Sequence, residues 1–414
     1  MSYSQKIASY AKFGIRLSLE RIENLLANLG DPHLQVPIVH IAGTNGKGSV
    51  CAYLSTVLEQ AGYTVGRYIS PHLFDWCERI TINNHWISTK ELEHYLARVE
   101  QAINPEYIPT QFELVTAIMW LYFAEQKVDI AVIETGLGGR LDATNVHPQP
   151  LVTSITSISR DHWQRLGDSL TQIASEKAGI IKPHCPVVVS ELPEPAEIVI
   201  KQKAQIQKAP LIKVEPAVLV DSLTNRFTWR SLTFQSSLVG EHQLFNTAIV
   251  LGIVELLNQQ GWQISAQAVQ TGMAETKWLG RLQWYEFAGK RWLLDGAHNV
   301  GSAVYLRKFI DQYFPDQPVT WIMGIIATKD AEGIIKTLLR PQDLLLAVPV
   351  PDHQSYTPEQ LASYAHKLLV NVPAPCASLE QAIALCLAKN YPQPIICGSL
   401  YLLGYFLAQQ AQPY

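Results

Sequence analysis

A chain of 414 residues is longer than one hydrophobic core usually organises, because single cores stop growing near about 250–300 residues. We therefore expect two domains. Hydrophobic residues make up 48% of the chain and charged residues 16%, which excludes a disordered or fibrous protein. The formal net charge of −4 gives no general attraction to nucleic acid or to an anionic membrane, so local groups must hold any anionic ligand.

The six cysteines are scattered and form no C-x-x-C pair, which argues against a zinc knuckle or a disulfide framework. Reduced thiols in a cytoplasm fit this pattern best. The N-terminus lacks the basic and then apolar layout of a signal peptide, and no uncharged apolar run approaches the ~18 residues of a membrane helix. We therefore expect a cytoplasmic protein without a membrane span.

Short apolar runs alternate with helical patterns along most of the chain, which predicts βαβ units and a mainly parallel sheet. The expected strands are residues 36–42, 64–69, 128–134, 151–158 and 186–190, and the expected helices are residues 49–60, 110–127 and 170–177. Residues 201–235 are less regular and rich in β-forming side chains, so we expect an antiparallel extension there.

The pattern restarts after two further helical segments, residues 241–260 and 265–275. The expected second set comprises strands at residues 281–287, 291–295 and 319–324 and a helix at 302–313. We place a domain boundary near residues 277–280. The predicted fold is therefore α/β, with a P-loop-containing, mainly parallel sheet domain over residues 1–277 and a smaller Rossmann-like α/β domain over 278–414.

A glycine-rich loop follows the first expected strand. Its residues are Gly43, Thr44, Asn45, Gly46, Lys47, Gly48 and Ser49. Glycines allow close backbone approach to a nucleotide phosphate, and we expect Lys47 to neutralise the β- and γ-phosphates and Ser49 to ligate Mg²⁺. The spacing departs from G-x-x-x-x-G-K-[ST], because Ile41 stands at the first glycine position and Gly48 separates Lys47 from Ser49.

The alternative for this loop is a glycine-rich turn without a ligand. Such a turn has no need of both a lysine and a hydroxyl among its glycines, so we favour phosphate binding. The reaction stays open at this point, since kinases, switch GTPases, motors and ligases share such loops.

Polar side chains follow three other expected strands: Ser70, Glu134 and His162. The carboxyl ends of parallel strands face a shared crevice, so these side chains can converge beside the loop. A hydroxyl, a carboxylate and an imidazole suit a divalent metal. Taken singly, Ser70 could cap a turn, Glu134 could pair with Arg140, and His162 could be a satisfied buried histidine; the repeated placement at strand ends favours the metal set.

Three further segments have a simple structural alternative. Residues 136–139 look like part of a dinucleotide fingerprint, but no helical pattern follows, so we expect a flexible loop. Glu176 and Lys177 stand at a helix end, where an exposed face with salt bridges is the ordinary interpretation. Asp295 and His298, with the neighbouring Asn299, could reach across a cleft or form a helix N-cap with a local Asn turn, and the residues suit both equally.

At this point the residues resemble the folylpolyglutamate synthase and dihydrofolate synthase family in its compact bacterial bifunctional form, a relative of the muramyl-peptide ligases. The matching motifs run in order through nearly the whole chain, at residues 13–15, 42–49, 70–72, 110–113, 134–145, 161–162, 176–182, 242–246, 280–281, 295–299 and 398–401. The chain departs from the family at Ile69, where threonine is common, and at Leu279, where proline usually precedes the glycine. Neither position is one that we assign to chemistry.

The resemblance implies ATP-dependent amide formation between L-glutamate and dihydropteroate or the γ-carboxylate of a reduced folate. The reaction would pass through an acyl phosphate and release ADP and phosphate. The implied cofactors are ATP and Mg²⁺, with a carbamate on Lys177. Residues 1–277 would then be an ATP-binding ligase domain.

The resemblance also assigns roles to particular residues. The expected catalytic residues are Lys47, Lys177 and His162, and the expected metal ligands are Ser49, Ser70, Glu134, His162 and Lys177. The implied ATP contacts outside the loop are Asn246, Arg281, Asp295 and His298, and the implied pterin site lies near Asp142 and Ala143.

Three alternatives stay open. A muramyl-type amino-acid ligase would share the loop, metals and carbamate, but the absence of an extra domain before Val36 speaks against it. A P-loop switch protein would need base-reading and switch signatures, which we do not find. A polyglutamate synthase alone would use folates only. The expected partners are small molecules, namely pteroate or folate, L-glutamate and ATP, without nucleic acid or membrane, and we expect a monomer.

Overall fold

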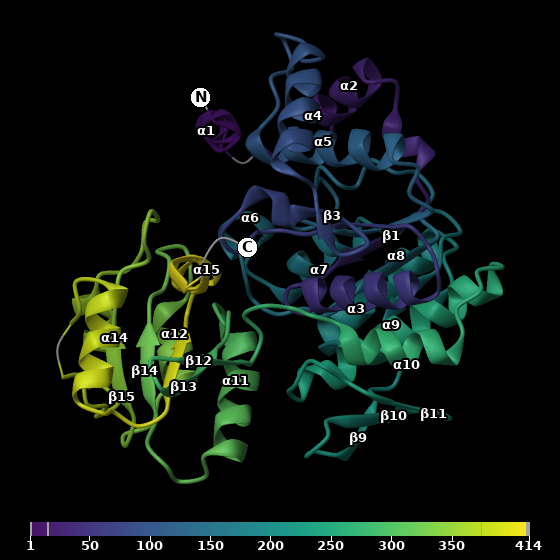
Figure 1. Cartoon of the computed structure of the whole chain (residues 1–414). Helices are drawn as coiled ribbons and strands as arrows, with labels where there is room; N and C mark the ends of the chain where they lie inside the picture. Colours follow the sequence, from purple (N-terminus) through teal and green to yellow (C-terminus); the bar gives the residue numbers. More distant parts are fainter. Residues whose placement is uncertain (1, 15, 374, 411–414) are drawn as a thin grey trace. The chain divides into compact units, whose positions relative to one another are not determined.

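The computed structural model describes residues 2–14, 16–373 and 375–410, so Ile15 of the first matching motif lies outside the described residues. The chain divides into two compact units. The first contains Met1–Ser159, Trp163–Ser237 and Gln243–Lys277, and the second contains Arg160–His162, Leu238–His242 and Trp278–Tyr414. Figure 1 shows the second unit mainly in the green and yellow colours of the C-terminal third.

An eight-stranded sheet in the order β4-β3-β2-β5-β1-β6-β7-β8 organises the first unit. Its strands are β1 Ile38–Ala42, β2 Val65–Tyr68, β3 Ile80–Ile82, β4 His85–Trp86, β5 Ile130–Glu134, β6 Val152–Ile155, β7 Val187–Val189 and β8 Leu211–Lys213. All neighbours from β2 to β8 pair in parallel, and β3 and β4 add an antiparallel edge. Strands β1, β2, β5, β6 and β7 are buried throughout, which explains their short continuous apolar runs.

Helices surround this sheet (Figure 1). They are α1 Tyr3–Ser9, α2 Glu20–Asn28, α3 Lys47–Gln60, α4 Thr89–Gln101, α5 Gln111–Glu125, α6 Trp163–Leu166, α7 Leu170–Ala178, α8 Glu194–Ile206, α9 His242–Gln259 and α10 Ala266–Glu275, with short 3₁₀ turns at Tyr10–Phe13, Pro32–Gln35 and Trp76–Arg79. Capping boxes begin α4, α5 and α7, because the N-cap hydroxyl and the third helical residue satisfy each other's backbone amides.

The antiparallel extension predicted for residues 201–235 is confirmed in its second half. Strands β9 Val218–Asp221, β10 Arg226–Trp229 and β11 Leu232–Gln235 form a three-stranded antiparallel sheet. The prediction is wrong for the first half. Residues 201–206 continue α8, since their lysines and glutamines are good helix formers, and β8 joins the main sheet in parallel with β7.

The second unit has a five-stranded sheet in the order β12-β13-β16-β14-β15. Its strands are β12 Gln283–Phe287, β13 Lys290–Leu294, β14 Thr320–Met323, β15 Leu344–Ala347 and β16 Pro394–Cys397, and its helices are α11 Val300–Tyr313, α12 Ala331–Leu338, α13 Pro358–His366, α14 Leu379–Ala388 and α15 Leu400–Gln410. Only the β12–β13 pair is antiparallel. The two α/β sheets confirm the predicted fold class.

Candidate active site

The glycine-rich loop between β1 and α3 is fastened to the segment that follows β6. The amide of Thr44 donates to the carbonyl of Ser157 (2.8 Å), and the amide of Asn45 donates to the Ser157 hydroxyl (2.9 Å). The Thr156 hydroxyl donates to the carbonyl of Asn45 (2.6 Å), and the amide of Ser159 donates to the Thr44 hydroxyl (3.1 Å). Sequence reasoning missed these supporting hydroxyls, although three hydroxyl residues within four positions after a strand are a usable signal.

Two positions of the loop must be glycine, because neighbouring side chains leave no space for a Cβ atom. A Cβ at Gly46, which caps α3 with φ of 89°, would collide with the side-chain amide of Asn246. A Cβ at Gly43 would collide with the hydroxyl of Thr156. The backbone therefore passes where only glycine fits. The structure thus brings Asn246, which the resemblance links to ATP, directly against the loop.

Lys47 lies at the first position of α3 and folds over the loop. Its Nζ donates to the carbonyls of Gly43 (3.1 Å) and Thr44 (3.2 Å) and lies 3.7 Å from Oε1 of Glu134. The other carboxylate oxygen of Glu134 accepts a hydrogen bond from the amide of Ser70 (3.3 Å). The structure therefore brings Glu134 and Ser70 together beside the loop, as the strand-end argument predicted.

Lys177, at the end of α7, is buried and reaches the same loop. Its Nζ donates to the carbonyl of Gly43 at 2.8 Å. The interpretation of this helix end as an exposed face with salt bridges is right only for Glu176, which pairs with Arg140 at 2.9 Å. The suggested pairing of Arg140 with Glu134 is wrong, because the Glu134 carboxylate is buried whereas the Arg140 side chain is 55% exposed.

The residues 135–150 contain no helix, as predicted, and the turn around Asp142 and Ala143 is buried. The Asp142 carboxylate accepts hydrogen bonds from the amide of Leu137 (2.7 Å) and from the amide (3.1 Å) and hydroxyl (2.5 Å) of Thr144. Burial raises the pKa of Asp142, and these bonds oppose the rise. The Thr144 hydroxyl also meets Nε2 of the buried His40 at 2.8 Å. Internal bonds therefore hold this turn in shape.

In the second unit, Asp295 and His298 shape the loop between β13 and α11. Asp295 accepts hydrogen bonds from the amides of Leu282 (2.9 Å) and Ala297 (2.9 Å). Nδ1 of His298 lies 2.7 Å from the carbonyl of Gly296, so Nδ1 must carry the hydrogen and Nε2 is left as an acceptor. A Cβ at Gly296 would collide with the guanidinium of Arg281. Three of the four residues implied as further ATP contacts therefore gather around Gly296.

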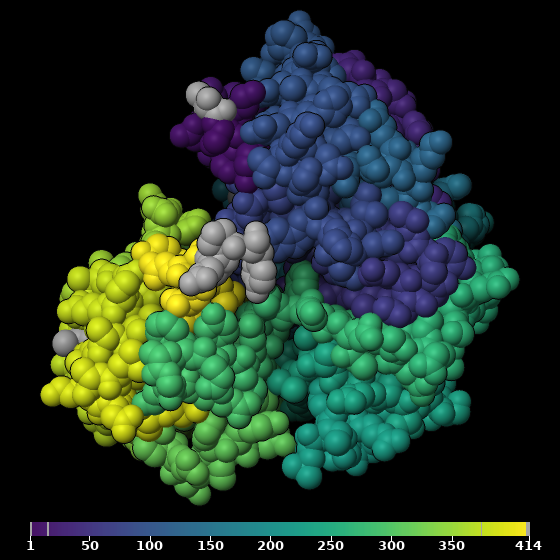
Figure 2. Space-filling view, viewed as in Figure 1, coloured from purple at the N-terminus to yellow at the C-terminus, as the bar shows by residue number. Residues whose placement is uncertain are grey.

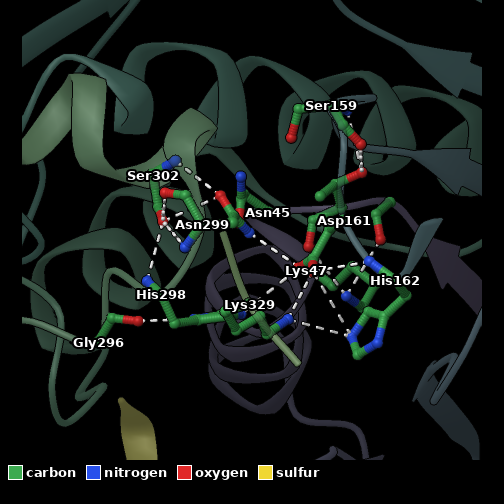
Figure 3. Close-up of polar contacts among 12 residues, drawn as sticks. Asn45, Lys47, Ser159, Asp161, His162, Gly296, His298, Asn299, Ser302 and Lys329 are labelled. Atoms are coloured by element: carbon green, nitrogen blue, oxygen red, sulfur yellow. Dashed lines mark hydrogen bonds and ion pairs between the residues drawn. The ribbon is translucent and has the colours of Figure 1, made fainter. Parts of the chain in front are cut away.

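Asn299 serves as the N-cap of α11, as the structural alternative predicted. Its side-chain oxygen accepts from the amide of Ser302 at 2.9 Å in a capping box. Its Nδ2 also donates to Oδ2 of Asp161 at 3.0 Å, and the same carboxylate forms a buried ion pair with Lys329 at 2.5 Å. Figure 3 shows both side chains pointing toward Asp161. Sequence reasoning missed Lys329, which carries no motif around it.

His162 is not a satisfied buried histidine, because its side chain is 47% exposed. Its Nε2 lies 3.4 Å from Nζ of Lys329. The structure groups it with Asp161 in the second unit, whereas Ser49, Ser70 and Glu134 belong to the first. Within the described part of the chain, no group of three His, Cys, Asp or Glu side chains forms a metal site. The expected metal ligands are not a group of this kind, because two of them, Ser49 and Ser70, are hydroxyl side chains.

Comparison with known proteins gives this arrangement its context. Residues 41–254 match the Mur ligase middle domain, and residues 287–409 match the C-terminal domain of dihydrofolate synthetase. Dihydrofolate synthetase of Saccharomyces cerevisiae is 33% identical over 418 residues, which cover 95% of this chain and 97% of that protein. The chain belongs to the folylpolyglutamate synthase and dihydrofolate synthase family.

Other members of the family agree in sequence and in fold. Dihydrofolate synthase/folylpolyglutamate synthase of Bacillus subtilis is 37% identical over 344 residues, which cover 79% of this chain and 80% of that protein. The structure of E. coli FolC in complex with DHPP and ADP has a TM-score of 0.87 at 28% identity, covering 99% of both chains.

Family membership confirms the resemblance drawn from the motifs. The chain is an ATP-dependent acid–amino-acid ligase that acts on small molecules. Across the described residues, the helices are all too short or too polar to cross a membrane.

Proposed function

We propose that this chain joins L-glutamate both to dihydropteroate and to the γ-carboxylate of reduced folates, and that ATP activates the acceptor carboxylate as an acyl phosphate. The observation that carries the proposal is the meeting of Lys47, Lys177 and Glu134 at the phosphate loop of a family member. The Lys47 cation and the Glu134 carboxylate, with the Lys177 amine at the same glycine-rich loop, suit the transfer of a phosphoryl group.

The chemistry follows from the need to activate a carboxylate. A free carboxylate is a poor acyl donor, whereas an acyl phosphate is a good one. The acceptor carboxylate attacks the γ-phosphate, ADP leaves, and the amine of glutamate then attacks the acyl carbon as phosphate leaves. Lys47 neutralises charge on the triphosphate during the first step, so its contribution is electrostatic and positional. Exclusion of water protects the acyl phosphate from hydrolysis.

The side chains around the loop fit Mg²⁺, because hard cations prefer oxygen ligands. Ser49 and Ser70 supply hydroxyls, and Glu134 supplies a carboxylate held beside Ser70. A carbamate on Lys177 would complete a second position, and His162 stays a predicted ligand. When bound, the metal screens charge on the phosphates and on the tetrahedral oxyanion.

A carbamate on Lys177 would turn a buried cation beside the loop into an anionic oxygen ligand. The buried position of Lys177 at the Gly43 carbonyl supports this part of the proposal, because Lys47 of the glycine-rich loop donates to the same carbonyl oxygen. An unmodified Lys177 would be an ammonium and would repel a metal ion bound to Glu134, because both are cations.

The remaining assignments complete the proposal. Asn246 stands against the loop, while Arg281, Asp295 and His298 surround Gly296, and we assign all four to ATP. We assign the pterin body of the acceptor to the turn at Asp142 and Ala143, within a ligase domain of residues 1–277 that precedes a smaller domain of residues 278–414. We expect a cytoplasmic monomer.

An amide-formation assay tests the proposal. Purified chain is given ATP, Mg²⁺ and L-glutamate with either dihydropteroate or a tetrahydrofolate monoglutamate, and kcat/KM is compared. The two acceptor carboxylates lie at different distances from the pteridine, and reacting atoms must approach to ~3–3.5 Å, so one rigid pose cannot serve both. Turnover of both acceptors is expected. Turnover of the folate alone would reduce the assignment to a polyglutamate synthase, and glutamate-independent ATP hydrolysis without amide would favour a switch protein.

A further inference from the structure

A groove of about 560 Å³ opens on the first unit between α10 and the strands β10 and β11, and no catalytic assignment uses it. Its volume lies within the range of small-molecule sites, roughly 300–1,000 Å³. Its lining is mostly polar, with three side-chain amides, three hydroxyls, one guanidinium and one carboxylate. Figure 2 shows the hairpin in teal at the surface of this unit, next to the green segment that contains α10.

The floor of the groove is the face of the β10–β11 pair that points away from the core. Phe227 and Phe234, which are partners across the two strands, are 1% and 3% exposed and face the interior. Side chains alternate along a strand, so those of Thr233 and Gln235 point to the opposite face. Arg226 shares that face, because it pairs in register with Gln235. The floor therefore presents a hydroxyl, an amide and a guanidinium.

The wall of the groove is a polar stripe of α10. The lining residues at the spacing of one helix face are Gln267, Gln270, Thr271 and Ala274. The buried residues of the same helix are Ala268, Val269, Gly272 and Met273. The helix thus turns its apolar stripe inward and a stripe of hydrogen-bonding side chains toward the groove.

The direction of α10 relative to β11 follows from two contacts. Nε2 of Gln270 donates to the carbonyl of Thr233 at 2.8 Å. Three residues further along the helix, the carbonyl of Met273 accepts from the amide of Ser237 at 3.1 Å. The helix and the strand therefore run side by side in the same direction. Glu275, which follows Met273, lies toward the end of β11.

Both charged residues of the lining consequently stand at one end of the groove. Arg226 lies across the strand pair from Gln235, the last residue of β11, and Glu275 is the last residue of α10. Both side chains are exposed, so a ligand can reach them. A cation and an anion at the same end match the carboxylate and the ammonium that an α-amino acid carries on one carbon atom.

Other classes of ligand fit the described lining less well. A nucleobase stacks on aromatic side chains, and Phe234 is only 3% exposed. A lipid needs mainly apolar walls, whereas eight of the ten lining residues are polar or charged. A chain of phosphates needs several cations, and the lining supplies one guanidinium. An amino-acid zwitterion uses both charges and the amides and hydroxyls around them.

The groove is connected to α3, the helix that begins at Lys47. Oε2 of Glu275 accepts from Nε2 of Gln60, the last residue of α3, at 3.1 Å. The hydroxyl of Tyr53, in the middle of α3, lies 2.5 Å from that of Ser236, which directly follows β11. A ligand at this end of the groove therefore meets a carboxylate that is already bonded to the helix of the glycine-rich loop.

We propose that this groove is a regulatory site for an amino-acid zwitterion, supplied by a free amino acid or by a short peptide. Arg226 binds the carboxylate, Glu275 binds the ammonium, and the neighbouring amides and hydroxyls bind the polar remainder. The ammonium competes with Gln60 for Glu275, so occupancy of the groove acts on α3. This inference goes beyond the proposed ligase activity, and binding to the groove can be measured without turnover.

Isothermal titration calorimetry with L-glutamine is the first measurement, because the amide of this amino acid matches the lining. The wild-type chain should bind it with a Kd below about 10 mM. Arg226→Gln and Glu275→Gln should each weaken binding about tenfold. Arg230→Gln is the matched control, since Arg230 is an exposed arginine of the same hairpin that pairs with Glu255 at 2.6 Å outside the groove. It should keep the wild-type Kd, as should Lys47→Ala.

Two truncated ligands assign each charge to its partner. 4-Carbamoylbutanoate is glutamine without its α-amino group, and 4-aminobutanamide is glutamine without its carboxylate. The wild-type chain should bind each about tenfold more weakly than glutamine. Glu275→Gln should lose the discrimination against the first compound, and Arg226→Gln that against the second, because each variant lacks the charge that the compound can no longer use. Tighter binding of L-alanyl-L-glutamine than of glutamine would identify a peptide as the occupant, and weaker binding a free amino acid.

The regulatory role has its own readout. Saturating L-glutamine should change KM for ATP by at least about twofold in the wild-type chain and leave it unchanged in Arg226→Gln. Binding to the groove without this change would overturn the regulatory role.

Three results would overturn the site itself. They are the absence of binding at about 10 mM glutamine, a wild-type Kd in both groove variants, and loss of binding in Lys47→Ala alone, which would place the ligand at the glycine-rich loop. If the wild-type chain forms no amide, the proposed function fails, while calorimetry still decides whether the groove binds the zwitterion.

Discussion

Nζ of Lys177 lies 2.8 Å from the carbonyl oxygen of Gly43, although the two residues stand 134 positions apart in the chain. One comes from the last turn of α7 and the other from the turn after β1. This contact joins two motifs that the sequence presents separately, and it places a lysine amine at the loop where phosphate chemistry is proposed.

The loop lysine gives the most direct prediction. Lys47→Ala should lower the amide-forming rate by about 100-fold or more, because the counter-charge on the triphosphate is lost. The Tm should stay within a few degrees of the wild-type value. Lys90→Ala, at an exposed position of α4, is the control and should be fully active. A Lys47→Ala protein with native Tm and most of its activity would contradict the phosphate-loop assignment.

The second prediction concerns the chemical state of Lys177. Protein equilibrated with ¹³C-labelled bicarbonate should give a ¹³C carbamate resonance, and Lys177→Ala should lose both that resonance and ligation, since an anionic oxygen is needed where an ammonium would repel the metal. Lys182→Ala is the control variant for both measurements, because Lys182 is also a partly buried lysine and lies close to Lys177 in the chain. Full activity of Lys177→Ala, or an active wild type without the resonance, would refute the carbamate.

The third prediction concerns the buried pair of Lys329 and Asp161. Burial by itself raises the pKa of Asp161, but Lys329 and the neighbouring histidines outweigh it and lower that pKa well below its ordinary value. Lys329→Met should therefore reduce the free energy of unfolding by about 3–5 kcal/mol at pH 7, because a buried carboxylate loses its counter-charge.

A matched control for that pair exists in the same unit. Lys308 pairs with Glu241 at 2.8 Å, but the two side chains are 55% and 47% exposed. Lys308→Met should lower the free energy of unfolding, measured by denaturant titration, by less than about 1 kcal/mol. Equal costs for the two variants would show that the Asp161 pair contributes no more than a surface contact.

The fourth prediction is loss of stability in mild acid. Burial lowers the pKa of His40 to about 3, with Lys182 adding to the effect. The unfolded chain takes up this proton near pH 6.5, whereas the folded chain does not, so the contribution of His40 is complete above about pH 6.5 and declines as the pH falls. In the His40→Gln variant, the free energy of unfolding should depend less steeply on pH between about pH 6.5 and 5, as measured by urea titration. An unchanged slope would contradict the pKa assignment.

Local patterns were sufficient to predict the glycine-rich loop between β1 and α3. The glycines, Lys47 and Ser49 lie within seven positions, and the buried strands around them read as apolar runs, because parallel strands are covered on both faces. The pairing of Asp161 with Lys329 could not be predicted in this way. The two residues are 168 positions apart, and each looks like an ordinary surface charge until the fold places them together.

The same limit applies to regions with weak patterns. Residues 201–206 continue α8, although their lysines and glutamines show little helical periodicity, and β8 pairs with β7 rather than with the antiparallel strands that follow it. The positions of Thr156 and Ser157 under the phosphate loop likewise depend on β6 lying beside β1, which the order of strands along the chain does not reveal.

The assignment of Arg160–His162 to the second compact unit bears on how the chain could be divided. A fragment ending at Lys277 would contain Asp161 but neither Lys329 nor Asn299, and the complementary fragment would contain both donors without the carboxylate they share. Cutting the polypeptide at that junction therefore separates a buried anion from its partners in each piece. Each unit is compact, but neither is one uninterrupted stretch of sequence. A fragment cut at this junction therefore cannot keep Asp161 together with Lys329 and Asn299.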